Sequence, residues 1–166
     1  MANPLYGQNK SDDIISQAKQ RTVPSLTGAD LADGTDSISL VLDTFYRTLV
    51  TTGGTKPLVL PSISASDIGK KIQIVSNAVL AGSGVITITC ASGDTYSMAS
   101  TLTGHAQTNA GPAAETNNVL TLTGANTNCG WAKGSTMILE VVAENEWCCV
   151  VNSAHTGAGS NFAAFS

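Results

Sequence analysis

The side chains of this chain that could do chemistry are few and widely spaced. The two histidines, His105 and His155, each lie among turn residues and belong to no motif. General acid–base catalysis needs a base held within hydrogen-bond reach of the substrate proton, and the sequence has none of the spaced motifs that provide such an arrangement. The twelve acidic residues have no context that indicates a catalytic carboxylate pair. We therefore expect no catalytic residue, no enzyme activity and no small-molecule substrate.

Cysteine and aspartate spacing also argues against a metal centre. The four cysteines form no Cys-x-x-Cys pair, and the adjacent Cys148 and Cys149 would face opposite sides of a strand. We expect free thiols, and a bridge between Cys90 and Cys129 stays open as an alternative. The stretch 30–36 holds three aspartates around a glycine, but it does not follow the EF-hand spacing, and a turn explains the same residues. The sequence predicts no metal ion and no cofactor.

The composition limits the kinds of partner. Only 12% of the residues are charged, against about 25% in typical soluble domains. The formal net charge is −4, which argues against nucleic-acid binding because that function needs a basic face. No run approaches the roughly 18 apolar residues of a membrane span, and the first residues lack the pattern of a secretory signal. Such a surface belongs either to an ordinary Thr/Ser-rich β protein or to one whose surface is covered in an assembly.

The elements that must position any site are short β-branched runs separated by Gly, Asn, Ser and Pro. This pattern is typical of a small all-β fold, which we expect to be an antiparallel sandwich or barrel, jelly-roll-like, with an extended N-terminal arm. The predicted strands are residues 57–61, 67–75, 84–89, 118–124, 135–142 and 146–151.

The chain divides into three parts. Residues 1–36 carry few large apolar side chains and cannot bury enough surface to fold alone, so we expect an extended arm, with at most a short helix over 12–20. Residues 37–157 form the β-sandwich or barrel body. Residues 158–166 form a C-terminal tail whose aromatic residues dock either on the core or on a neighbouring subunit.

Two segments of the body are less regular. The stretch Ser37–Thr51 fits both helical spacing and strand alternation, and its β-branched and aromatic content favours a strand. The stretch 91–117 is a long polar insertion, either a partner contact or a surface excursion. Trp131 and Trp147 are expected in the core.

A series of motifs runs through residues 45–157 in a fixed order. They are Leu58-Val59-Leu60-Pro61, Asp67-Ile68-Gly69-Lys70, the Gly-x-Val-x-Ile-Thr strand at 84–89, Gly93-Asp94-Thr95, Leu120–Ala125, the Gly-Ser strand at 134–142, and Glu146-Trp147-x-x-Val150-Val151. This order resembles a domain of tailed-phage structural proteins, and the opening at Met1–Asn9 is cyanophage-like. The polar insertion at 91–117 departs from the pattern.

The resemblance implies a capsid decoration, or cement, protein. Such a protein would be made in the host cytoplasm and bind the outer capsid surface of the virion as a homotrimer, with the major capsid protein as its partner. It would stabilise the shell by bridging capsid subunits. We expect the arm to make the capsid contact, with Leu5, Tyr6, Ile14 and Ile15 as apolar anchors. The alternative is a phage tail-fibre, baseplate or receptor-binding module.

Overall fold

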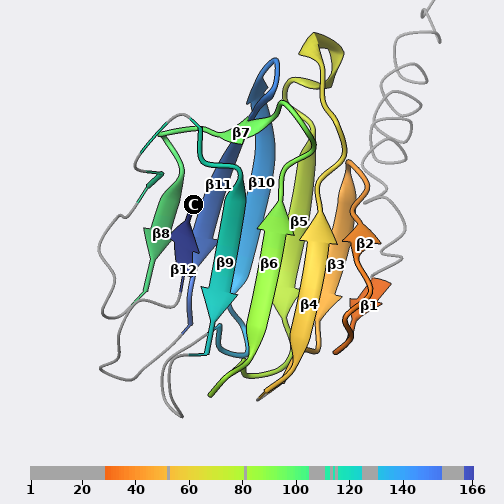
Figure 1. The fold of residues 1–166 in the computed structure, drawn as a ribbon, viewed down its shortest axis with the longest axis vertical. Coiled ribbons are helices and arrows are strands. Elements are labelled where there is room, and N and C mark those ends of the chain that lie inside the picture. Colours follow the sequence, from red (N-terminus) through yellow and green to blue (C-terminus); the bar gives the residue numbers. More distant parts are fainter. Residues whose placement is uncertain are drawn as a thin grey trace, which may run out of the picture.

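The fold is a two-layered β-sandwich, seen in a computed structural model of the chain (Figure 1). The residues described below are 29–51, 53–80, 82–104, 111, 112, 114, 116–124, 131–154 and 163–166. They form two mixed sheets that lie face to face around one core, and the all-β sandwich predicted from the sequence is confirmed. No helix in these residues is long and apolar enough to cross a bilayer.

The first sheet, sheet A, has the strand order β1-β3-β5-β10-β11-β7, and β8 also pairs with β11. Its strands are β1 (Ala29–Leu31), β3 (Thr44–Thr48), β5 (Lys71–Ser76), β7 (Thr95–Tyr96), β8 (Thr101–Thr103), β10 (Thr136–Ala143) and β11 (Glu146–Asn152). The second, sheet B, has the order β12-β9-β6-β4-β2. Its strands are β2 (Ile38–Ser39), β4 (Thr55–Val59), β6 (Val85–Thr89), β9 (Val119–Thr123) and β12 (Ala163–Phe165).

The first six strands alternate between the two sheets along the chain. From β1 to β6 each successive strand belongs to the other sheet, so the neighbour of a strand within its sheet is two strands away in sequence. β1, β3 and β5 are therefore parallel, and so are β2, β4 and β6. The pairing differs here from the antiparallel arrangement expected from the sequence, because the segments between these strands cross from sheet to sheet instead of turning back as hairpins.

The strands β9, β10 and β12 of the second half pair in the antiparallel sense. β10 pairs with both β5 and β11, and β9 pairs with both β6 and β12. The β10–β11 hairpin turns at Glu144-Asn145, where Asn145 has a φ of 62°. Asparagine tolerates this left-handed conformation better than most residues do. Through the pairs β5–β10 and β6–β9, these strands join each sheet to the first six strands of the chain.

The core consists of the inward residues of both sheets. Alternation along β6, β9 and β10 turns Ile, Leu and Met inwards and leaves every second residue outside. Trp131 and Trp147 are both fully buried, as predicted. Trp131 also donates a hydrogen bond from Nε1 to Oγ1 of Thr48 at 2.9 Å, which joins two segments 83 residues apart in sequence.

The two irregular segments contain strands. The stretch 37–51 holds β2 and β3, which lie in different sheets and are separated by a turn in which Asp43 has a φ of 56°. The strand interpretation is confirmed for these two pieces. The predicted insertion at 91–117 contains β7 and β8, which run parallel to β11 and bury Tyr96 and Leu102. Part of this segment therefore belongs to the sheet.

The start of the body lies earlier than the sequence boundary at residue 36. β1 is the edge strand of sheet A, and Leu31 is fully buried in the core. The Leu31 carbonyl accepts a hydrogen bond from the Leu49 N–H at 2.9 Å. Near the other terminus, Phe165 stacks at a tilt on Tyr96 with ring centroids 5.0 Å apart, so this aromatic residue packs on its own core.

The Asp67 carboxylate accepts hydrogen bonds from three donors in the loop before β5. Lys70 Nζ donates to Asp67 Oδ1 at 2.7 Å, and the Ser64 hydroxyl and N–H donate to Oδ2 at 2.8 and 3.0 Å. The Lys70 ammonium, followed by these Ser64 donors, lowers the pKa of Asp67 from 3.8 to about 2. The negative charge at Asp67 therefore favours the folded state.

Replacement of the Asp67 carboxylate should reduce the loss of folding stability at low pH. The depressed pKa of Asp67 means that its contribution is present above about pH 4 and is lost as the pH falls towards 2. We expect Asp67→Asn to unfold at lower urea concentration than the native chain at pH 7, and the difference to vanish near pH 2. Asp36→Asn, at an exposed carboxylate, is the control. A difference that persists at pH 2 would contradict this role of the charge.

Candidate partner-binding surface

The outer face of sheet B has no charged side chain among its described residues. Its cross-strand rows follow from the strand register. We call this surface the threonine face; it consists of Ser39, Thr55, Pro57, Val59, Val85, Thr87, Thr89, Val119, Thr121, Thr123 and Ala164. Figure 1 shows β4, β6 and β9, which carry most of it, side by side across the sheet.

The local sequence explains why this face has its composition. In β6 and β9, threonine and valine alternate with isoleucine and leucine, so the larger aliphatic residues all turn into the core. Thr87 of β6 lies directly opposite Thr121 of β9, at the centre of the face. β-Branched residues favour strands and have restricted χ1 rotamers. The face is therefore an ordered surface of hydroxyl and methyl groups.

The outer face of sheet A is different because it carries charges. Lys71 of β5 lies opposite Glu140 of β10, and its Nζ is 3.1 Å from the Glu140 carboxylate. Arg47 and Glu146 also occupy outward positions in this sheet. Opposite charges on a solvated face favour solubility. The two layers of the sandwich thus present one charged and one uncharged outer face.

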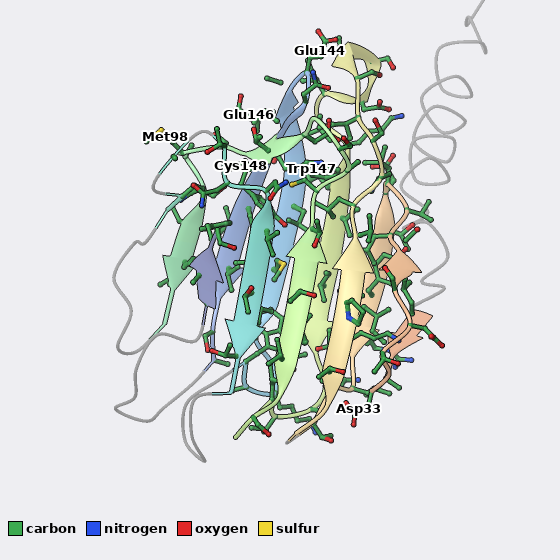
Figure 2. All side chains as sticks on the ribbon, viewed as in Figure 1. Asp33, Met98, Glu144, Glu146, Trp147 and Cys148 are labelled. Atoms are coloured by element: carbon green, nitrogen blue, oxygen red, sulfur yellow. The ribbon has the colours of Figure 1, made fainter. Side chains whose placement is uncertain are left out.

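A polar pocket of ≈ 390 Å³ lies at the end of the sandwich where β10 turns into β11. It is lined by Gly93, Thr95, Tyr96, Ser97, Met98 and the turn residues 144–146. Figure 2 shows Glu144, Glu146 and Met98 at this end, and Asp33 at the opposite end of the molecule. The described lining contains hydroxyl and carboxylate side chains but no histidine or thiol.

Two titratable groups of this region, Asp94 and Tyr96, are buried, and burial favours their neutral forms. Asp94 is 2% exposed and accepts a hydrogen bond from the Ile63 N–H at 3.2 Å, but burial raises the pKa of its carboxyl group. Tyr96 donates its hydroxyl to the Ile88 carbonyl at 3.0 Å, and burial raises its pKa well above the ordinary value. These groups stabilise the fold and do not reach the solvent to act as acids or bases.

The cysteines of the described chain are structural. Cys90, Cys148 and Cys149 are free thiols, and Cys148 and Cys149 face opposite sides of β11 as predicted. Burial raises the pKa of Cys90 to about 12 and that of Cys149 well above its usual value. A thiol with a raised pKa is a poor nucleophile. Cys129, to which the sequence allowed a bridge from Cys90, lies outside the described residues.

One aspartate of the stretch 30–36, Asp33, has a structural explanation. Asp33 accepts hydrogen bonds from the Thr51 N–H at 3.2 Å and from the Thr51 hydroxyl at 3.1 Å. A Cβ atom on Gly54 would collide with the Asp33 carboxylate as it is placed, so a larger residue there would displace this side chain from Thr51. Among the described residues, no group of three or more His, Cys, Asp or Glu side chains could hold a metal ion.

The predicted capsid anchors lie outside the part of the chain that the structure describes. These anchors are Leu5, Tyr6, Ile14 and Ile15, and the two histidines are also outside it. The threonine face was not predicted as a surface, although the alternation that creates it is visible in the runs at 85–89 and 119–123. To find it from sequence, one would need to know that these two strands are neighbours in one sheet.

Comparisons of the chain with protein-family models, with curated proteins and with solved structures find no match.

Proposed function

We propose that this chain is a virion structural protein that decorates the outer capsid surface of a tailed phage. In this role it binds the major capsid protein as a homotrimer and stabilises the shell by bridging capsid subunits. The observation that carries the proposal is the threonine face, because an outer sheet face without charged side chains is poorly protected against association and so suits contact with another protein. The order of motifs between residues 45 and 157 supports the same role.

The distribution of polar groups also supports binding over chemistry. The described thiols are free, with raised pKa values, and Asp94 and Tyr96 are committed to hydrogen bonds inside the body. A decoration protein needs rigid surfaces that fit a repeating lattice. Many symmetric copies then multiply contacts that are individually weak. The sandwich suits that role, because its described inward side chains pack in the core and its outward side chains form two flat faces.

The test of this function is binding to empty shells of the phage that encodes the chain. The purified protein should sediment with the shells until a fixed number of copies per shell is reached. Bound protein should also raise the temperature at which the shells come apart, because binding to the assembled state alone stabilises that state. Failure to sediment with the shells at physiological salt would reject the proposed function.

A further inference from the structure

We propose that the end of the sandwich where β10 turns into β11 is a docking site for a basic segment of a protein partner. An arginine or lysine side chain of the partner enters the polar pocket beside Glu144 and Glu146, and apolar side chains next to it cover the surrounding surface. We call this region the hairpin end; it consists of residues 41–43, 67–71, 93–98 and 140–146. The inference goes beyond the proposed function, which assigns no contact to this end.

The pocket at the hairpin end is bounded by β7 on one side and by the β10–β11 turn on the other. The Thr95 N–H donates to the Asn145 carbonyl at 2.9 Å, and the Ser97 N–H donates to the Trp147 carbonyl at 2.7 Å. These backbone bonds fix the two sides relative to one another. The volume of ≈ 390 Å³ lies within the range of ligand pockets, so the pocket can receive one long side chain.

The lining of the pocket is rich in hydrogen-bond acceptors. Glu144 and Glu146 carry carboxylates, and neither has an ion-pair partner among the described residues. Ser97 is 8% exposed, and its hydroxyl accepts from the Ala99 N–H at 3.2 Å, which leaves a second lone pair for a ligand. Guanidinium and ammonium groups only donate hydrogen bonds, so they match these oxygens. An anionic ligand would be repelled by the two carboxylates.

The charge excess of the described chain also lies at the hairpin end. Two carboxylates there are paired with lysines at 2.7 and 3.1 Å, as Asp67–Lys70 and Lys71–Glu140. A further one, Asp94, is buried. The carboxylates without an ion-pair partner among the described residues are Asp43, Glu144 and Glu146. The remaining described residues hold equal numbers of acids and bases, namely Asp30, Asp33, Asp36, Arg47, Lys56 and Lys133. A basic partner is therefore attracted to this end in preference to the rest of the body.

Exposed apolar side chains beside the pocket indicate that the cation belongs to a protein. Of the five large apolar side chains exposed in the described residues, four belong to the hairpin end: Val41, Ile68, Met98 and Val142. The Gly69 N–H donates to the Val141 carbonyl at 2.8 Å, which brings Ile68 beside the end of β10. Met98 lines the pocket itself, and the flexible thioether of methionine adapts to a partner's shape. Figure 2 shows Met98 at the same end as Glu144 and Glu146.

The strand order sets the length of the partner segment. The hairpin end extends across β3, β5, β10, β11 and β7, which are neighbours in sheet A. Four spacings between these strands give roughly 20 Å. An extended segment of about six residues spans that distance. A short basic segment with apolar neighbours therefore fits both the pocket and the apolar side chains beside it.

The experiment titrates the full-length, isotope-labelled protein with acetyl-Leu-Arg-Leu amide and follows the backbone amide signals by NMR. We expect saturable shifts in the pocket residues 93–98 and 144–146, with an affinity of about a millimolar because one open pocket supplies few contacts. The same peptide with citrulline in place of arginine keeps the shape and loses the charge, so it should bind at least about tenfold more weakly. Methylguanidinium lacks the apolar neighbours and should bind at least about fivefold more weakly.

Two double variants test the residues. Glu144→Gln combined with Glu146→Gln should weaken peptide binding at least about fivefold, because the pocket loses both charges. The control combines Asp36→Asn with Glu140→Gln, which removes the same charge outside the lining and should keep the native affinity within about twofold. Circular dichroism and urea unfolding confirm that each variant is folded.

The inference would be overturned by any of three results. These are the absence of saturable shifts at the pocket, binding of the citrulline peptide or of methylguanidinium as tight as that of the arginine peptide, and native affinity in the folded variant that lacks both glutamates. The titration contains no shells, so each of these results leaves the proposed function untouched. Failure of the protein to bind shells would reject the proposed function and leave the docking site in place.

Discussion

Removal of residues 1–28 is expected to leave the sandwich folded and to abolish binding to capsid shells. The described body begins with β1 at Ala29, and Leu31 is buried in its core, so the cut keeps every described strand. A cut beyond Leu31 would remove an edge strand and a core side chain together. The proposed anchors, Leu5, Tyr6, Ile14 and Ile15, would all be lost with the arm.

The expected loss of affinity is large. Complete burial of one large apolar side chain contributes about 1.5–3 kcal/mol, and each 1.4 kcal/mol changes a dissociation constant about tenfold. Loss of four such anchors should weaken shell binding at least about 100-fold, even after the entropy cost of ordering the arm. The measurement is sedimentation of the protein with shells over a range of concentrations. Circular dichroism and the urea midpoint report whether the shortened chain remains folded.

Two full-length variants separate the anchors from the rest of the arm. In the first, Leu5, Tyr6, Ile14 and Ile15 are changed to alanine. In the matched control, the polar residues Gln8, Asn9, Ser16 and Gln17 are changed to alanine instead. We expect the first variant to lose binding and the second to keep it. If the folded chain without residues 1–28 binds shells as the native chain does, the arm does not make the shell contact and the body must make it.

Truncation of Trp131 should have the largest effect on stability of any single change considered for this protein. The side chain is fully buried, and its indole N–H bonds to the buried Thr48 hydroxyl. The Trp131 carbonyl also accepts from the Leu80 N–H at 3.0 Å, so this residue holds the segment before β10 against the body. Removal of a buried tryptophan side chain costs about 3–5 kcal/mol. Trp131→Ala should therefore lose a large share of the 5–15 kcal/mol typical of domains.

A comparison with Trp147 isolates the hydrogen bond. Trp147 is equally buried, but its Nε1 has no hydrogen-bond partner within the described part of the chain. Replacement by phenylalanine shortens both side chains similarly, whereas only Trp131→Phe breaks a bond and leaves the Thr48 hydroxyl without its donor. We expect Trp131→Phe to cost about 1 kcal/mol more than Trp147→Phe. Urea unfolding at neutral pH measures both. An equal or larger cost for Trp147→Phe would contradict the role given to the Trp131–Thr48 bond.

Alternation in the sequence predicted the strands that lie at the centre of the sheets. In β6 and β9, isoleucine and leucine alternate with threonine and valine, which is the pattern of a half-buried strand. The burial of both tryptophans followed from the same reasoning. These features are local, because the burial of one side of a strand depends little on which strand is its neighbour.

Strand order and the uncharged face could not be predicted in the same way. Parallel pairing of β4 with β6 depends on the excursion of the chain through β5 in the other sheet, and no local pattern marks that crossing. The strands β7 and β8 were missed because two or three residues show no periodicity, and they form by pairing with β11. The threonine face arises only when β4, β6 and β9 are placed side by side. The residues of each strand can be read from the local sequence, but the face they form depends on the tertiary fold.

The central claim is that this chain acts by binding the outer surface of a capsid, and imaging of shells incubated with the full-length protein tests it most directly. Electron cryo-microscopy of such shells should show added density at symmetric positions on the outside, in a shape that fits the two-layered sandwich. The same density should be absent from shells incubated with the chain that lacks residues 1–28. Shells that remain bare at saturating concentrations of the folded native protein would contradict the account.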